Sequence, residues 1–201
     1  TFTGLFASNF LPTTIGGDAV RLAGAMQMGF DRAVCLASIA ADRLIGLLGM
    51  SMTLPIGLAY SWNLLRPTGA SFLLLGLLQR PLAFLKRTFS VFGLWLKHPS
   101  ALWQSLFFTW INMLGLFGSV YIFVNDLGAH ASFWMVAGLW SLTYFVTLIP
   151  ISINGYGLLE LSFTFLLTQL TGATSAVGLS VAVLIRAFLI LTSLPGALFL
   201  P

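Results

Sequence analysis

The sequence has 201 residues, of which 58% are hydrophobic and 7% are charged, with nine Lys and Arg against five Asp and Glu. A soluble domain carries about 25% charged residues, so this composition excludes a soluble fold and predicts an integral membrane protein. The single cysteine, Cys35, excludes a disulfide framework and a cysteine-based metal site.

The first segment, residues 1–17, carries no charge but is interrupted by Pro12, Gly16 and Gly17. Proline removes a backbone donor and glycine permits irregular turns, so we expect the end of a helix or a re-entrant segment here. Irregular backbone cannot face lipid, and the interruption is therefore expected to line a cavity. Since the chain begins inside apolar sequence without an initiator Met, we expect a fragment of a longer protein.

Seven further segments predict helices by their length and apolar content. They are a long span at residues 33–60, a short, weak span at 69–85, an interfacial amphipathic helix at 82–97, clean spans at 100–124 and 131–149, a short apolar helix at 157–171 and a last span at 174–198. They predict one all-α polytopic transmembrane domain over residues 1–201, with about five to seven transmembrane or re-entrant helices. Asp31 and Arg32 are expected at the membrane interface, where the long span begins.

The connection at residues 80–99 is basic and amphipathic, which is typical of a segment at the membrane surface. Its charges are Arg80, Lys86, Arg87 and Lys97. The positive-inside rule assigns this connection to the cytoplasm. The loop at residues 125–130 has no Lys or Arg, which fits the opposite side.

The interruption of the first segment occurs a second time. An aliphatic residue and a proline are followed five residues later by a glycine, at Gly17 and at Gly155, and a charge follows nine or ten residues after each proline, at Arg21 and at Glu160. Further on, each half has an arginine ten residues after an Ala-Val pair. Matching interruptions in two halves point to the binding site of secondary transporters. The alternative is that apolar sequences align by chance.

Few charges remain outside the basic connection. A charged side chain at mid-membrane costs about 2.5–3.5 kcal/mol on insertion scales, so such residues face the interior and pair. The candidate central set holds three acids and three arginines: Asp18, Arg21, Asp42, Arg43, Glu160 and Arg186. A purely structural role is hardest to argue for Arg186, because long uncharged stretches flank it and place it in the middle of a span.

The other five each have a structural alternative. Asp18 and Arg21 lie three residues apart, which suits a pair within one helical turn. Asp42 and Arg43 suit one membrane face, with Arg43 extending toward the headgroups. Glu160 suits a cap for the helix that begins after Gly157.

Arginine is suited to a lipid phosphate because its planar fork makes two hydrogen bonds and keeps its charge. The same arginines would also serve as counter-ions to the three acids. No sequence feature indicates an enzyme, a cofactor or nucleic acid, because His98 and His130 lack a ligand cluster and there is no P-loop. The stretch "NGYG" at 154–157 lacks the Thr-Val that precedes GYG in potassium filters.

Four stretches carry a resemblance: "SNFLPTTIGGDAVR" from residue 8, "ADRLIGLL" from 41, "IPISINGYGLLE" from 149 and "LIRAFLIL" from 184, closing in "LPG". In this order they resemble the transmembrane, flippase-like domain of the lysylphosphatidylglycerol synthase (multiple peptide resistance factor) family, over about residues 4–198. The resemblance implies a multi-pass protein of the bacterial or archaeal cell membrane that moves an amphipathic lipid between leaflets. Two helices that usually precede the first motif, and the aminoacyltransferase domain, are not in the sequence.

The family's motif positions overlap the central set. As substrate-binding residues the resemblance implies Asn9, Asp18, Arg21, Asp42, Arg43, Ser152, Asn154, Glu160 and Arg186. As cavity-lining breaks it implies Pro12, Gly16, Gly17, Pro150, Gly155 and Gly157.

Three functions are compatible with these features. The first is a translocator of a phospholipid or a polyprenyl-phosphate-linked lipid. The second is a non-catalytic membrane anchor or partner of a lipid-modifying synthase or glycosyltransferase. The third is an ion-coupled transporter of a small solute that uses Glu160 as a proton or cation site.

Overall fold

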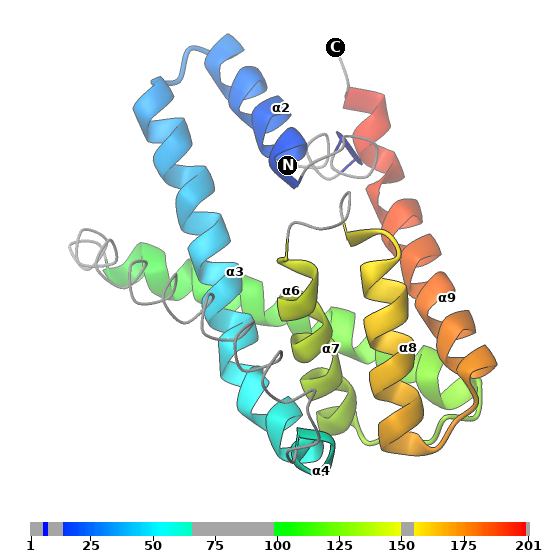
Figure 1. Ribbon diagram of the computed structural model, residues 1–201. Coiled ribbons are helices and arrows are strands. Elements are labelled where there is room, and N and C mark those ends of the chain that lie inside the picture. Colours follow the sequence, from blue (N-terminus) through cyan, green and yellow to red (C-terminus); the bar gives the residue numbers. More distant parts are fainter. Residues whose placement is uncertain (1–5, 8–13, 66–98, 150–154, 200–201) are drawn as a thin grey trace.

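The computed structural model describes residues 6–7, 14–65, 99–149 and 155–199, and all regular elements in these ranges are helices (Figure 1). In chain order the elements are α2 (Thr14–Gln27), α3 (Arg32–Tyr60), α4 (Trp62–Leu65), α6 (Pro99–Asp126), α7 (Phe133–Thr147), α8 (Leu158–Thr171), α9 (Ser175–Ser193) and the 3₁₀ helix η2 (Leu194–Phe199). The expected all-α polytopic membrane fold is confirmed. The predicted helices at 69–85 and 82–97 and the basic connection lie outside the described residues.

Within the described residues, three helices are long and apolar enough to cross a membrane: Arg32–Tyr60, Trp103–Asp126 and Ser175–Leu198. They correspond to the spans predicted at 33–60, 100–124 and 174–198. The span predicted at 131–149 is shorter than expected, because α7 has 15 residues. At a rise of 1.5 Å per residue α7 is about 22 Å long, which is less than the hydrocarbon core of about 30 Å.

The helix starts follow from their capping residues. The Asp31 carboxylate accepts hydrogen bonds from the backbone N–H groups of Ala33 and Val34, so the long span begins at Arg32 as expected. The Thr174 hydroxyl accepts from Val177 and starts α9 in the same way. A side-chain oxygen at this position satisfies a backbone donor that has no partner within the helix.

The prediction that Gly16 and Gly17 break the first segment is wrong. Helix α2 begins at Thr14, so both glycines lie in its first turn. Glycine is tolerated there because the first backbone N–H groups of a helix have no intrahelical acceptor in any case. Pro12 lies outside the described residues.

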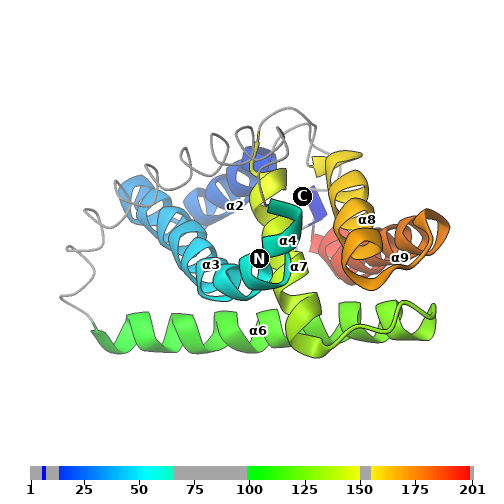
Figure 2. The same ribbon diagram turned by 60° about the horizontal axis from the view of Figure 1, so that its bottom comes forward.

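Two helical hairpins flank the central helix α7. Figure 1 shows α2 and α3 on one side of α7, and α8 and α9 on the other. The turn between α2 and α3 lies at the top of this view and the turn between α8 and α9 at the bottom, so the hairpins run in opposite directions. Figure 2 shows α6 crossing beneath the other helices.

The core lies where α6, α7, α8 and α9 meet. Its fully buried side chains include Phe117 of α6, Leu139 of α7, Phe163 and Leu167 of α8 and Ile185 of α9. Helix α3 joins this core through α7 at a very close crossing. A Cβ atom added to Gly57 of α3 would lie 2.3 Å from the carbonyl oxygen of Gly138 in α7. Small residues let two membrane helices approach to backbone contact in this way.

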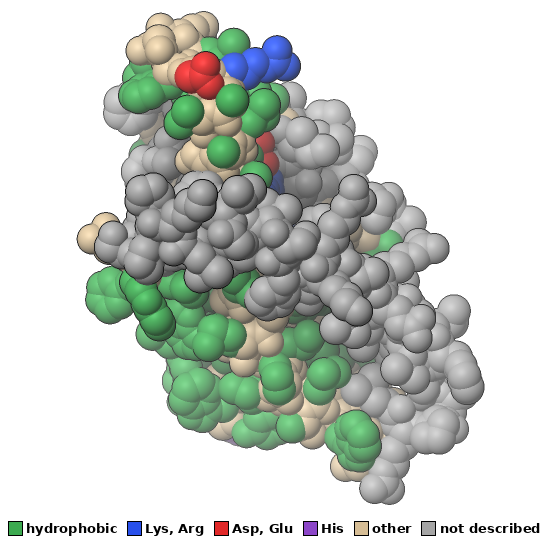
Figure 3. Space-filling model, turned by 90° about the vertical axis from the view of Figure 1, so that its left-hand side faces the viewer, with side chains coloured by type: hydrophobic (Ala, Val, Ile, Leu, Met, Phe, Trp, Pro, Cys, Tyr) green, Lys and Arg blue, Asp and Glu red, His purple; other side chains and the backbone are tan. Residues whose placement is uncertain are grey.

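The outer surface is apolar. Large exposed side chains include Trp103, Phe107 and Phe108 on α6 and Phe165 on α8. Figure 3 shows hydrophobic side chains over most of the coloured surface of one face, with Lys, Arg, Asp and Glu only in its upper part. An apolar surface of this extent fits contact with lipid.

Candidate functional site: two ion-paired hairpins

Four charged side chains meet where α2 packs against α3. Arg43 of α3 donates from Nε and Nη2 to Oδ2 of Asp18 on α2, at 2.9 and 2.7 Å. Arg21 of α2 donates from Nη2 to Oδ2 of Asp42 on α3, at 2.5 Å. Within α2, Arg21 Nη1 lies 3.7 Å from Asp18 Oδ1. The shorter pairs run crosswise, so these charges join two helices and do more than stabilise one turn.

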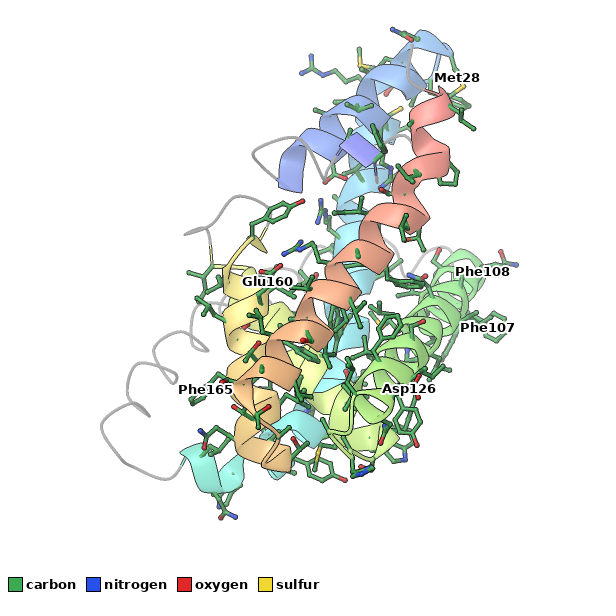
Figure 4. All side chains as sticks on the ribbon, turned by 90° about the vertical axis from the view of Figure 1, so that its right-hand side faces the viewer. Met28, Phe107, Phe108, Asp126, Glu160 and Phe165 are labelled. Carbon is green, nitrogen blue, oxygen red and sulfur yellow. The ribbon has the colours of Figure 1, made fainter. Side chains whose placement is uncertain are left out.

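A second ion pair joins α8 to α9. Arg186 Nε donates to Oε1 of Glu160 at 2.8 Å, and Arg186 Nη2 donates to the carbonyl of Gly155 at 3.2 Å. Oε2 of Glu160 accepts the N–H of Gly157 at 2.7 Å. Glu160 therefore caps α8 and pairs with Arg186 at once. Figure 4 shows Glu160 near the upper end of α8.

The two hairpins place their ion pairs at matching positions. Arg43 lies twelve residues after the capping residue Asp31, and Arg186 lies twelve residues after the capping residue Thr174. Arg43 is separated from Asp18 by 25 residues, and Arg186 from Glu160 by 26. In both hairpins the arginine Nε donates to the carboxylate of the first helix.

This geometry changes one part of the predicted repeat. Counting from the two prolines aligns Arg21 with Glu160, whereas the hydrogen bonds align Asp18 with Glu160. The reason is that α8 begins eight residues after Pro150 and α2 begins two residues after Pro12. Equal distances from the prolines therefore reach different turns of the two helices.

The C-terminal end of α7 lies beside both ion pairs. Arg43 interacts electrostatically with Tyr144 of α7. Three residues further along the same helix, Thr147 packs on Gly155, since a Cβ atom added to Gly155 would lie 3.4 Å from Thr147 Cβ. Gly155 in turn accepts the hydrogen bond from Arg186. One helix end thus connects the two hairpins.

The α8–α9 pair and the α2–α3 pairs differ in burial. The side chains of Arg186 and Glu160 are only 12% and 16% exposed. Each α2–α3 pair instead has one half-exposed partner: Asp18 and Arg43 are 18% and 49% exposed, and Arg21 and Asp42 are 28% and 51% exposed. The α8–α9 pair is therefore screened much less, and each of its partners depends more strongly on the other.

Each of the six residues of the predicted central set forms an ion pair with another member of the set, always within its own hairpin. Gly155 and Gly157 lie at the α8–α9 site, with positive φ angles of 71° and 77°. The predicted positions Asn9, Pro12, Pro150, Ser152 and Asn154 lie outside the described residues.

The sequence reasoning missed Tyr156. Its ring lies over the Arg186 guanidinium, with Cζ 4.2 Å from the ring centroid, which is a cation–π contact. An aromatic residue between two glycines was visible in the sequence, but the direction of its side chain depends on the fold of the turn. Tyr144 was also missed because its link to the site passes through the packing of α7 on α3.

Among the described residues, no three His, Cys, Asp or Glu side chains lie close enough together to hold a metal ion. Both carboxylate oxygens of Glu160 already accept hydrogen bonds. The geometry of Glu160 is therefore that of a paired and capping carboxylate, and it lends no support to its use as a proton or cation site.

A family model described as "Lysylphosphatidylglycerol synthase TM region" matches residues 1–196. No curated protein and no solved structure matches the chain.

Proposed function

Because the chain belongs to the lysylphosphatidylglycerol synthase transmembrane-region family, a family of membrane proteins in lipid metabolism or translocation, we propose that it is a lipid translocator. Its substrate would be a phospholipid or a polyprenyl-phosphate-linked lipid. The chain itself would not be an enzyme and would need no cofactor. Its partners would be membrane lipids and a lipid-modifying enzyme, in the cell membrane of a bacterium or archaeon.

One observation carries this proposal: two hairpins of opposite direction hold equivalent acid–arginine pairs on either side of one helix end. Inverted repeats of this kind build many secondary transporters, whose substrate site lies at the repeat interface. In such proteins the two halves exchange roles, so that the site opens first to one side of the membrane and then to the other.

The paired arginines suit a phosphate headgroup. Each carboxylate neutralises its arginine while the site is empty, which limits the cost of holding charge in the membrane. A phosphate diester adds hydrogen bonds to the guanidinium edges that the carboxylates leave open. The more exposed α2–α3 pairs suit the first encounter with a headgroup, and the buried Arg186 suits a later position on its path.

The experiment is a leaflet-specific transfer assay. Protein is reconstituted into liposomes that carry a fluorescent phospholipid, and the accessibility of that lipid to a membrane-impermeant quencher is followed over time. We expect wild type to transfer lipid faster than empty liposomes. Arg186→Lys, which keeps the charge but loses the planar fork, is expected to lower the rate at least tenfold.

Two further variants complete the design. The double variant Glu160→Gln/Arg186→Gln leaves no unpaired charge in the site, so a loss of transfer in it cannot be ascribed to a buried ion. Arg32→Gln removes an exposed arginine at the start of α3 and is expected to transfer at the wild-type rate. Unchanged transfer in both Arg186 variants would exclude Arg186 from the substrate path.

A membrane anchor for a lipid-modifying synthase or glycosyltransferase is a second candidate. It is favoured by the complete pairing of the six central charges, since such pairs also serve to hold helices together. This function predicts that wild-type protein transfers no lipid above empty liposomes for any headgroup. It also predicts that a synthase from the same cell co-purifies with the protein.

A further inference from the structure

Tyr156 belongs to a turn of which three consecutive residues contact the ion pair between Arg186 and Glu160. The three consecutive residues Gly155, Tyr156 and Gly157 contribute a carbonyl, an aromatic ring and an N–H group respectively. The carbonyl and the ring contact Arg186, and the N–H group contacts Glu160.

The flanking glycines make this turn possible. Their φ angles of 71° and 77° lie in the left-handed region, where residues with a Cβ atom are strained. With this backbone the Tyr156 ring lies over the guanidinium while the neighbouring carbonyl and N–H groups reach the same ion pair.

Among the described residues, these contacts leave one edge of the Arg186 guanidinium without a hydrogen-bond acceptor. A guanidinium has five N–H donors in a planar fork. Nε donates to Glu160, one Nη2 hydrogen donates to Gly155, and the ring of Tyr156 covers a face. Nη1 donates to none of the residues that the structure describes. The edge formed by Nη1 and Nη2 is thus the part of the fork that can receive two oxygens of a phosphate.

We propose that Tyr156 is a positioning residue that holds the Nη1–Nη2 edge of Arg186 toward the entering headgroup, and that it thereby makes the translocator selective for phosphate-bearing lipids. This inference rests on the proposed function. Without the ring, Arg186 keeps its charge and its hydrogen bonds to Glu160 and Gly155, but nothing covers the face of its guanidinium, so the orientation of the plane depends on the Nε bond and on the longer Nη2 bond of 3.2 Å alone. A less firmly held fork presents both N–H groups to a phosphate for a smaller part of the time, whereas a lipid without phosphate does not use that edge.

The test compares two lipids in the transfer assay. One is fluorescent phosphatidylglycerol and the other is a fluorescent glycosyl diacylglycerol, which has similar chains but no phosphate. Tyr156→Phe keeps the ring, and its preference for phosphatidylglycerol is expected to equal that of wild type. Tyr156→Leu removes the ring, and its preference is expected to fall by about two- to thirty-fold, the range that a cation–π contact supports.

The ratio of the transfer rates of phosphatidylglycerol and glycosyl diacylglycerol distinguishes a loss of Arg186 positioning from a general loss of protein stability. A variant that only unfolds or loosens the protein slows both lipids equally and leaves the ratio unchanged. An unchanged ratio in Tyr156→Leu would overturn the inference. If the leucine variant does not fold, Tyr156→Met, which fills a similar volume without a ring, takes its place.

A binding measurement separates this inference from the proposed function. Purified protein in detergent is heated with and without phosphatidylglycerol, and the shift in Tm is recorded. Wild type and Tyr156→Phe are expected to be stabilised more than Tyr156→Leu. If wild type moves neither lipid but keeps this difference in Tm, the proposed function fails while the role of Tyr156 stands. Equal shifts in all three proteins would overturn that role as well.

Discussion

Arg43 bonds to one carboxylate oxygen of Asp18 through two of its nitrogens, and Arg186 bonds to Glu160 at the equivalent position of a hairpin that runs the other way. A charged residue in a membrane helix is tolerated when it faces the protein interior and has a partner. Each hairpin pairs its arginine with a carboxylate of the neighbouring helix, but the two hairpins differ in how deeply the ion pair is buried. That difference leads to the first prediction.

Double-mutant cycles are expected to show a stronger coupling for Glu160 with Arg186 than for Asp18 with Arg43. Removing one partner of a buried ion pair costs about 3–5 kcal/mol, because the other charge stays buried, whereas pairs near the surface are worth about 0–1 kcal/mol. The measurement is the free energy of unfolding in mixed micelles for Glu160→Gln, Arg186→Gln and the double variant, beside Asp18→Asn, Arg43→Gln and theirs. Equal coupling energies in the two cycles would show that burial does not set the strength of these pairs.

The crossing of α3 and α7 is expected to tolerate no added atom. Gly57→Ala would bring its Cβ to 2.3 Å from the carbonyl oxygen of Gly138, a backbone atom that cannot turn aside as a flexible side chain can. The helices must separate, which also strains the hydrogen bonds of Ser141 with Thr53 and with the carbonyl of Met50. We expect a loss of about 3 kcal/mol or more in unfolding free energy, in the range of severe overpacking.

A matched control exists in α6. A Cβ atom added to Gly118 would meet no atom within 4 Å, and this glycine lies inside a helix. Alanine is the better helix former by about 1 kcal/mol, so Gly118→Ala is expected to be neutral or stabilising. The same folding assay, run on both variants, separates the close crossing from the general effect of replacing glycine. A Gly57→Ala protein as stable as Gly118→Ala would mean that the helices do not touch.

Much of this architecture is predictable from local sequence. The bounds of α3, α6 and α9 follow from long apolar stretches, and the first of these helices begins where Asp31 offers a cap. The pairing of the six central charges follows from the cost of leaving any of them alone in a membrane.

What could not be predicted depends on the relation between helices. Asp18 and Arg21 are spaced for a pair within α2, yet each bonds more closely across to α3, because the register of α2 against α3 decides which partner lies nearer. The opposite directions of the hairpins likewise have no signature in either half alone. Tyr156 was missed because the turn that aims its ring is set by two glycine φ angles.

Helix α2 is expected to move more than its counterpart α8. Helix α8 buries Leu159, Phe163 and Leu167, whereas at residues 16–27 of α2 the one buried residue is Gly17, which has no side chain. Burial of large apolar side chains gives most of the stability of a packed helix, so α2 depends on its ion pairs with α3. Replacing one of these pairs without changing the net charge, by Arg21→Gln/Asp42→Asn, is therefore expected to release α2.

Spin-label distances test this motion in the full chain. In a Cys35→Ser background, labels at Ala23 of α2 and Met52 of α3 report on the first hairpin, and labels at Phe165 of α8 and Leu191 of α9 report on the second; all four side chains are exposed. We expect a broader distance distribution for the first pair in lipid nanodiscs, and further broadening in Arg21→Gln/Asp42→Asn. The second pair is expected to stay narrow in both proteins, since its hairpin is held by apolar packing. Equally narrow distributions for both hairpins, unchanged in the variant, would show that α2 is as firmly held as α8 and that the crosswise ion pairs are not what holds it.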